Sequence, residues 1–213
     1  MTDLSPQQAI TDKAQENTAW VSIEIPVTPG KLFDYLQDTQ RLFRLNPYLD
    51  IGKWDEISAG KQFHLEALNE MNGVAYNLVV TVESIRPCAG MFLSYDKGLK
   101  RALEITLQPS ANGSILTLRE HYHAASGSAE NQAELLKEVD QGLVHWASSI
   151  RQYLLGLERW GRFWPYRWYK ERFWLSMRPT HRRIARMLCW VTLLEFVVFL
   201  FIFAIYWNEL ARQ

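Results

Sequence analysis

The residues best suited to chemistry stand close together near the end of a predicted strand, in the stretch LREHYHA. His121 and His123 are two residues apart, so their side chains leave a strand on the same face. Two imidazoles at this spacing could hold a metal ion together with His64 or with the carboxylate of Glu66. The simpler interpretation is that both histidines close a strand at the rim of a sheet and contact solvent or backbone. We favour it and predict no metal site.

Glu120 is the second candidate, because it shares a strand face with the side chains of Leu118 and Tyr122. If that face lines a cavity, the carboxyl group is buried and, once protonated, could donate a hydrogen bond to a carbonyl group. A register shift of one residue would reverse every side chain of the strand. A structural ion pair with Arg101 or Lys100 is at least as good an explanation.

No sequence motif assigns a reaction to these groups. The chain contains no GxGxxG, HExxH, GxSxG or CxxC pattern. Its two cysteines, Cys88 and Cys189, are far apart, which is typical of a reducing compartment and not of a disulfide framework. We therefore predict that the protein is not an enzyme and has no catalytic residues and no cofactor.

Short strands and helices must position these side chains. The segment WVSIEIPV alternates polar and apolar residues, which predicts a half-buried strand. Two short helices are predicted next: one over TPGKLFDYLQD, with Thr28 as its cap and Pro29 in its first turn, and one that stops at Pro47. The remaining pieces are separated by Gly, Asn and Pro, including the turn NGS at 112–114, which favours an antiparallel sheet. These strand-like pieces are KQFHLEAL, VAYNLVVTVESI, MFLSYDKG, RALEITLQP and SILTLREHYHA.

A long helix is predicted after the last strand. Its apolar residues recur every three or four positions, so they form one face that can pack against the sheet, and the fold class is α+β. This stripe consists of Leu136, Val139, Leu143, Trp146, Ile150, Tyr153 and Leu157.

The order of a strand, two short helices, about six strands and a long helix resembles the helix-grip superfamily (SRPBCC) of START, polyketide-cyclase and coenzyme Q-binding lipid-transport proteins. The resemblance extends from Trp20 to Leu157 and is carried by the opening WVSIEIPVTPGKLFDYLQDTQRLFRLNP, the middle VESIRPCAGMFLSYDKGLKRALEITLQP and the closing GSILTLREHYHA. It implies a curved antiparallel sheet wrapped around the long helix, with an apolar ligand cavity between them.

The alternation of residues along the strands predicts which side chains face this cavity. The same side chains could instead fill a solid core, and the sequence does not separate the two possibilities. The predicted lining is Phe63, Leu65, Tyr76, Leu78, Val80, Leu93, Tyr95, Leu103, Ile105, Leu116, Leu118, Glu120 and Tyr122 from the strands, with Leu143 and Trp146 from the helix.

The segment Met187 to Trp207 is long and apolar enough to be a transmembrane helix. Its 21 residues cover roughly 30 Å, which is the thickness of the hydrocarbon core. Thirteen of them are Leu, Ile, Val or Phe, which together favour insertion by roughly 4–8 kcal/mol, whereas the central Glu195 opposes it by about 3 kcal/mol. A buried core helix is the weaker alternative. Such an anchor departs from the usual soluble members of the superfamily.

Charge is divided unequally along the chain and predicts its orientation. Residues 1–150 carry 12 Lys/Arg against 19 Asp/Glu, whereas residues 151–213 carry 11 against 4. Cationic residues, including Arg182, Arg183 and Arg186, precede the apolar segment, and only NELARQ follows it. Because cationic flanks stay in the cytoplasm, we predict a single-pass protein of the cytoplasmic membrane with its N-terminal domain in the cytoplasm.

The stretch RWGRFWPYRWYKERFW combines eight aromatic and five cationic side chains with one acid. Such a segment suits the headgroup layer of a lipid bilayer, so we predict that it lies at the membrane interface. Single-stranded nucleic acid is a weak rival, and a membrane protein partner is a stronger one. Pro165 is expected to kink or restart the helix, and spacing would align the tryptophans on one helical face. The predicted interface residues are Trp160, Arg162, Trp164, Arg167, Trp168, Arg182, Arg183 and Arg186.

Glu195 is unusual because acids inside a membrane span are normally paired. We predict that it contacts another membrane protein or a second copy of the chain, although it could also stay protonated and bond to its own backbone.

The predicted organisation is a flexible arm (1–18), a helix-grip domain (19–157), a basic and aromatic juxtamembrane segment (158–186), a transmembrane helix (187–207) and a short tail (208–213). The predicted function is a tail-anchored protein that binds a quinone, an isoprenoid or a lipid and presents it at the cytoplasmic membrane face. The alternatives are an accessory subunit that docks through its transmembrane helix, and an enzyme of the cyclase or aromatase type.

Overall fold

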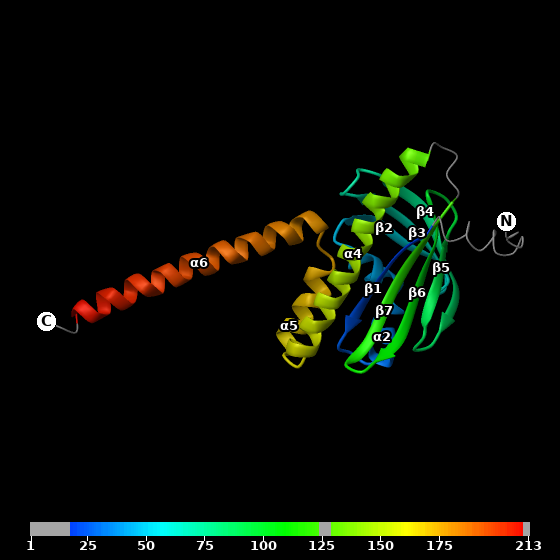
Figure 1. The fold of residues 1–213 in the computed structure, drawn as a ribbon. Coiled ribbons are helices and arrows are strands. Elements are labelled where there is room, and N and C mark those ends of the chain that lie inside the picture. The colour runs from blue at the N-terminus through cyan, green and yellow to red at the C-terminus, as the bar shows by residue number, and fades with distance from the viewer. Residues whose placement is uncertain (1–17, 124–128, 211–213) are drawn as a thin grey trace, which may run out of the picture. The chain divides into compact units, whose positions relative to one another are not determined.

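The computed structural model describes residues 18–123 and 129–210, with only the backbone described for residues 129–141 and 209–210. The chain divides into two compact units, residues 1–175 and residues 176–213. The first unit contains one seven-stranded antiparallel sheet in the order β1-β7-β6-β5-β4-β3-β2 (Figure 1). Its strands are β1 (Thr18–Ile25), β2 (Leu49–Ser58), β3 (Gln62–Asn69), β4 (Ala75–Arg86), β5 (Gly90–Tyr95), β6 (Lys100–Ser110) and β7 (Gly113–Tyr122).

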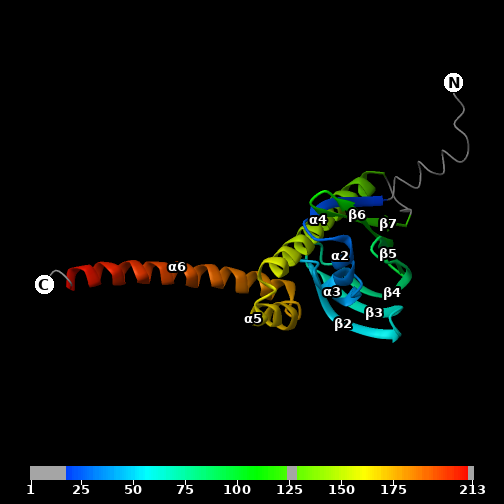
Figure 2. The same ribbon diagram turned by 90° about the horizontal axis from the view of Figure 1, so that it is seen from below.

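Two short helices fill the curve of the sheet, as Figure 2 shows from below. Helix α2 (Pro29–Leu36) begins with proline in its first turn, and Thr28 precedes it without a side-chain capping bond. Helix α3 (Thr39–Arg44) is capped by Asp38, whose Oδ1 accepts a hydrogen bond from the Arg41 N–H at 3.0 Å. The apolar sides of both helices are buried in the core.

Strand β2 was not among the strand-like pieces named from the sequence. It forms an edge of the sheet, is largely exposed, and contains irregularities between Ile51 and Lys53 and between Glu56 and Ser58. Each irregularity shifts the alternation of side chains by one residue, so the period of two is lost. The order of one strand, two helices, six strands and a long helix is nevertheless confirmed.

The long helix α4 (Ala129–Trp160) lies along the sheet next to β1 (Figure 1). From Leu143 onward, the predicted apolar stripe is buried in the core, through Trp146, Ile150, Tyr153 and Leu157. The side chains of Leu136 and Val139 lie outside the described part. The α+β helix-grip architecture predicted from the sequence is therefore present: a curved antiparallel sheet against a long helix.

The chain does not continue as one helix after Trp160. Gly161 donates to the Leu157 carbonyl at 2.7 Å, and α5 (Trp164–Trp168) starts afresh with Pro165 in its first turn. The π-helical turn η1 (Tyr169–Trp174) follows. The prediction that Trp160, Trp164 and Trp168 share one helical face is wrong, because it assumed an unbroken helix across this proline.

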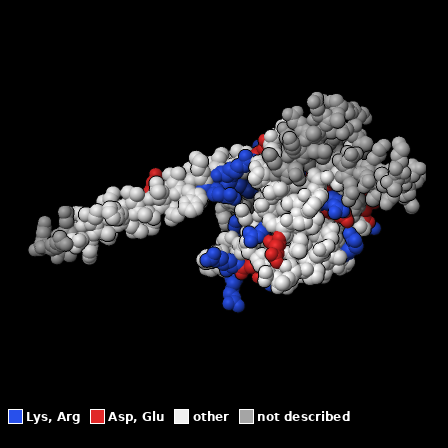
Figure 3. All heavy atoms as spheres, viewed as in Figure 1, with Lys and Arg blue, Asp and Glu red and all other residues white. Residues whose placement is uncertain are grey.

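The first unit extends to Leu175, which is buried and whose carbonyl accepts from Arg44 Nη1 at 3.2 Å. The second unit is formed by α6 (Pro179–Leu210). Its stretch Pro179–Asn208 is long and apolar enough to cross a membrane, and its apolar window is not buried. Figure 3 shows Lys and Arg side chains gathered where α6 begins and almost no charge along the rest of the helix.

Candidate functional site

A cavity of about 270 Å³ opens at one end of the sheet. Its wall is formed by the residues after α3, the β3–β4 loop, the start of β4, the β5–β6 loop with the first residue of β6, the end of β7 and the middle of α4. A deeper extension of about 40 Å³ shares much of this lining and reaches Phe43, Leu49, Leu65 and Tyr95. The main cavity is lined by Asn46, Tyr48, Asn69, Met71, Asn72, Val74, Ala75, Tyr76, Asn77, Leu78, Lys97, Gly98, Leu99, Lys100, Glu120, Gly142, Leu143 and Trp146.

The inner wall of the cavity is apolar and rigidly held. Leu78 and Leu143 are buried, and the Trp146 indole donates from Nε1 to the Leu42 carbonyl at 3.0 Å. Phe43 packs against Trp146 with ring centroids 5.7 Å apart. The hydrogen bond to Leu42 satisfies the one polar atom of the indole, so the ring contributes apolar surface to the wall.

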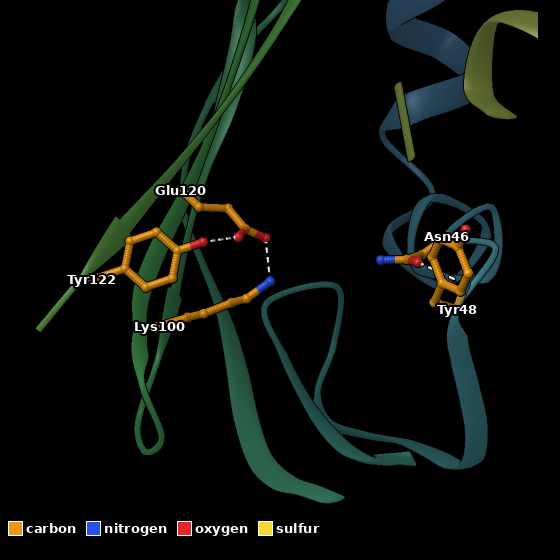
Figure 4. A network of polar contacts seen from close by, with 5 residues as sticks. All are labelled: Asn46, Tyr48, Lys100, Glu120 and Tyr122. Carbon is orange, nitrogen blue, oxygen red and sulfur yellow. Dashed lines mark hydrogen bonds and ion pairs between the residues drawn. The ribbon is translucent and has the colours of Figure 1, made fainter. Parts of the chain in front are cut away.

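Glu120 places a carboxylate in this apolar wall with only 1% of its surface exposed. Its Oε1 accepts from Lys100 Nζ at 2.5 Å, and its Oε2 accepts from the Tyr122 hydroxyl (Figure 4). Of the two explanations offered by the sequence, the ion pair with Lys100 is the one observed. A buried carboxylate is tolerated because both of its oxygens are paired.

An irregularity in β6 brings Lys100 to the same face as Glu120. Leu103 lies opposite Glu120 and Ala102 lies opposite His121, but Lys100 lies opposite Tyr122. Arg101 is therefore an extra residue in the pairing, and it is exposed. This β-bulge reverses the alternation and turns the Lys100 amine inward.

The tyrosines beside Glu120 remain neutral far above physiological pH. Burial raises the pKa of Tyr95 well above its ordinary value, and the negative charge of Glu120 adds to the effect. Burial and Glu120 also raise the pKa of Tyr122, which donates to that carboxylate. Burial raises the pKa of Tyr153 to about 12.

These shifts predict alkaline unfolding. Below about pH 10 the tyrosines are protonated in both the folded and the unfolded chain, so they leave stability independent of pH. Above it, the unfolded chain loses protons that the folded chain retains, so stability should fall as pH rises from 10 toward 12. Absorbance at 295 nm measures tyrosinate, and tryptophan fluorescence measures unfolding. Tyr95, Tyr122 and Tyr153 should lose their protons only at the pH at which the protein unfolds. Their titration in the still folded protein would contradict the prediction.

Three asparagines stand at the mouth of the cavity, and each uses its side-chain oxygen in a local turn. The Oδ1 atoms of Asn46, Asn69 and Asn72 accept from the backbone N–H groups of Tyr48, Met71 and Val74, at 3.0, 3.0 and 3.1 Å. Because a backbone N–H can only donate, the accepting atom of each amide must be oxygen. In Figure 4 the amide nitrogen of Asn46 points toward the side on which Lys100 and Glu120 lie.

Seven residues of the predicted lining border the cavity or its extension: Leu65, Tyr76, Leu78, Tyr95, Glu120, Leu143 and Trp146. Tyr122 is buried and contacts the cavity wall through Glu120. Phe63 borders a separate hollow at the other end of β3. The other predicted residues, Val80, Leu93, Leu103, Ile105, Leu116 and Leu118, are buried in the solid core.

The polar mouth was not predicted from the sequence. Asn46, Asn72 and Lys97 lie in loops, Asn69 ends β3, and Gly142 has no side chain, so no periodicity marks the side that these residues face. The available signal was the frequency of Asn and Gly in the stretch ALNEMNG, which predicts turns but not what the turns enclose.

The histidines are not brought together. His64 lies 2.9 Å from the Asn77 Oδ1 and 3.9 Å from Glu66, whereas His121 lies 3.7 Å from Glu104 on another part of the sheet. Within residues 18–123 and the described parts of the helices, no group of three His, Cys, Asp or Glu side chains could hold a metal ion.

The aromatic and basic residues predicted at the membrane interface are exposed, except for Arg182, which is half-buried and donates to the Met177 carbonyl at 2.9 Å. Trp160, Trp164 and Trp168 each expose about half of their surface or more. In the neighbouring turn, Lys170 Nζ lies 4.6 Å above the Trp174 ring. Arg162 and Arg167 are exposed in the same unit, and Arg182, Arg183 and Arg186 lie in the first two turns of α6. Glu195 is exposed in the apolar part of α6.

Comparison with solved structures identifies the fold. A START superfamily protein from Mycobacterium smegmatis matches with a TM-score of 0.51 and 13% identity, over 63% of this chain and 94% of that chain. This chain has the helix-grip fold. A protein from Nitrosomonas europaea matches with a TM-score of 0.52 and 12% identity, over 70% and 98%. The protein XoxI from Bacillus cereus matches with a TM-score of 0.50 and 17% identity, over 66% and 97%.

In each of these three matches, about two-thirds of this chain aligns with almost the whole of the other protein. The remaining third of this chain lies outside the shared fold. No protein-family model matches the chain, and no curated protein is significantly similar to it in sequence. Identity below 20% supports the common fold and says nothing about the ligand.

Proposed function

We propose that this protein holds a hydrophobic molecule in the cavity between its sheet and α4 and presents it at the face of the membrane that α6 spans. The observation that carries this proposal is the cavity itself, with carbon surface on its inner wall and a few polar groups at one side. That combination is typical of sites that bind small apolar molecules. The apolar α6 supplies a means of staying where such molecules are dissolved.

The size of the cavity limits how much of a ligand is enclosed. At about 270 Å³ it lies near the lower end of ordinary ligand pockets, which start at about 300 Å³. A long quinone, isoprenoid or lipid would therefore have its head or one end inside, with the rest of its chain outside.

Gly142 offers a way to close the cavity without harming the fold. Among the described residues, a Cβ at this helical position would meet only Met71 Sδ, at 4.0 Å. Gly142→Leu should fill the entrance and lower the amount of co-purified apolar ligand by about tenfold or more, a loss equivalent to only about 1.4 kcal/mol of binding. Thermal stability should be unchanged or higher, because leucine is about 0.5–1 kcal/mol better than glycine inside a helix. Organic extracts of the detergent-purified protein, analysed by mass spectrometry, measure the ligand.

Val144→Leu is the matched control, because Val144 is 47% exposed on the same helix. It should retain the ligand. Equal ligand content in wild type and Gly142→Leu would contradict binding in this cavity, and wild-type protein that is empty and takes up no apolar probe would contradict the function.

The cytoplasmic orientation is testable through the native cysteines. Cys88 is exposed in the β4–β5 turn, and Cys189 lies in the apolar part of α6. In sealed vesicles of known orientation, a membrane-impermeant maleimide should label Cys88 only where the cytoplasmic face is outside. The variant Cys88→Ser reports on Cys189, which should react only after detergent is added. Labelling of Cys88 from the opposite side would reverse the orientation.

Glu195 favours one further role, that of a subunit in a membrane complex. An acid in the apolar part of a span is normally paired, and within the described part of α6 no ion pair of Glu195 is present. Copurification of a membrane partner that disappears on Glu195→Leu would support this role. A cyclase or hydrolase is less well supported, because both oxygens of Glu120 are engaged by Lys100 and Tyr122.

A further inference from the structure

We propose that the cavity selects amphiphiles whose head group carries negatively charged oxygen, a carboxylate or a phosphate, over neutral ones. This inference rests on the proposed binding function and specifies the chemical class of its ligand. The selectivity follows from the polar atoms at the mouth that are not used in hydrogen bonds within the protein.

The three asparagines at the mouth have unused amide donors, whereas their oxygens already accept hydrogen bonds. The Oδ1 atoms of Asn46, Asn69 and Asn72 are occupied by backbone N–H groups of their own turns. Each amide nitrogen still has two N–H bonds to give, and no partner for it lies among the residues described. A ligand with oxygen acceptors can bond to these amide N–H groups, whereas a ligand donor meets oxygens that already accept one hydrogen bond each.

Among the described residues that line this cavity, Glu120 is the only acid, and both of its oxygens are occupied as well. One carboxylate oxygen accepts from Lys100 and the other from Tyr122. The negative charge of Glu120 is therefore balanced by the positive charge of Lys100 in the wall of the cavity. Lys100 keeps further N–H donors beyond the one given to Glu120, because an ammonium group has three.

The charge balance of the lining also favours an anion. Among the described lining residues, Lys97 and Lys100 stand against the single charge of Glu120, so a ligand with one negative charge balances these three groups. Lys97 lies 3.8 Å from Asp96, but that pair is at the surface, where water screens it. Hydrogen bonds from such donors to charged oxygen are about twice as strong as those to a neutral carbonyl or hydroxyl.

Three probes with the same eight-carbon chain test the proposal on the full-length protein in phosphatidylcholine nanodiscs. Radiolabelled octanoate, octyl phosphate and octanol are compared by equilibrium dialysis, with empty nanodiscs subtracted. Either anion should bind about tenfold or more tightly than octanol, and the tighter anion names the head group. Octanol binding as tightly as both anions would overturn the selectivity and leave the binding function intact, whereas no binding of any probe would overturn both.

Asparagine-to-aspartate variants provide the second arm. Asn46→Asp and Asn69→Asp keep the oxygen that closes each turn but replace two donors with a charged acceptor. Each should weaken binding of the preferred anion about tenfold or more and leave octanol binding unchanged. The control is Asn112→Asp, which makes the same charge change in the exposed β6–β7 turn at the other end of the sheet. An equal loss in all three variants, or no loss at the mouth, would overturn the proposal.

Discussion

Lys100→Met is expected to lower the free energy of unfolding by about 3 kcal/mol, the lower end of the range for breaking a buried ion pair. The substitution leaves the Glu120 carboxylate, which is 1% exposed, with the Tyr122 hydroxyl as its remaining partner. The lower end applies because the Lys100 side chain is itself 25% exposed, so water can replace part of what the ammonium supplied. Thermal unfolding in detergent, followed by tryptophan fluorescence, should show a midpoint lower by roughly 6–12 °C.

Two further variants distinguish the buried pair from a general effect of removing charge. The double variant Lys100→Met/Glu120→Gln should recover much of the loss, because the amide is neutral and its oxygen can still accept from Tyr122. Lys97→Met, three residues earlier in the β5–β6 loop and with a 75% exposed side chain, should change stability by less than about 0.5 kcal/mol. If Lys100→Met proves as harmless as Lys97→Met, the pair does not support the fold.

The same pair shows how far alternation along a strand can be followed from the sequence. The faces of β3, β4, β6 and β7 were predicted correctly, because a strand with one buried side needs apolar residues at every second position. Strict alternation in β6 would place Arg101 inside with Leu103 and leave Lys100 outside. The β-bulge at Arg101 instead turns Lys100 inward and leaves Arg101 outside. The pattern of apolar residues in the sequence does not show where a bulge will occur.

Other features escaped prediction for different physical reasons. Whether buried side chains enclose a cavity depends on how closely the sheet and α4 approach, and composition does not set that distance. The mouth is built from turns whose asparagines make local hydrogen bonds, and the sequence does not show that these turns border one cavity. The restart of the helix was predicted correctly from Pro165, whereas the alignment of the three tryptophans on one face, predicted from their i, i+4 spacing, fails because a new helix starts between Trp160 and Trp168.

Removal of α6 is expected to have the largest effect on where the protein is found. Full-length protein should remain in the membrane fraction after washing with high salt or alkaline carbonate, because the thirteen Leu, Ile, Val and Phe residues of 187–207 outweigh Glu195 by roughly 1–5 kcal/mol. A chain that ends at Leu175, the last residue of the first compact unit, should be released by the same wash. Fractionation followed by immunoblotting measures both.

The first unit alone should still bind anionic vesicles at low salt. It keeps the exposed Trp160, Trp164 and Trp168 together with Arg162 and Arg167, and each basic residue near an anionic surface contributes about 1 kcal/mol. Because such attraction is screened, flotation with anionic vesicles should be lost between about 0.05 and 0.5 M salt, and it should be weak with phosphatidylcholine alone. A chain ending at Trp207, which lacks only residues 208–213, is the control and should resist the wash like the full-length protein. If the full-length protein also stays unbound when vesicles float, α6 is not an anchor. The proposal that the protein presents a ligand at the membrane would then be contradicted as well.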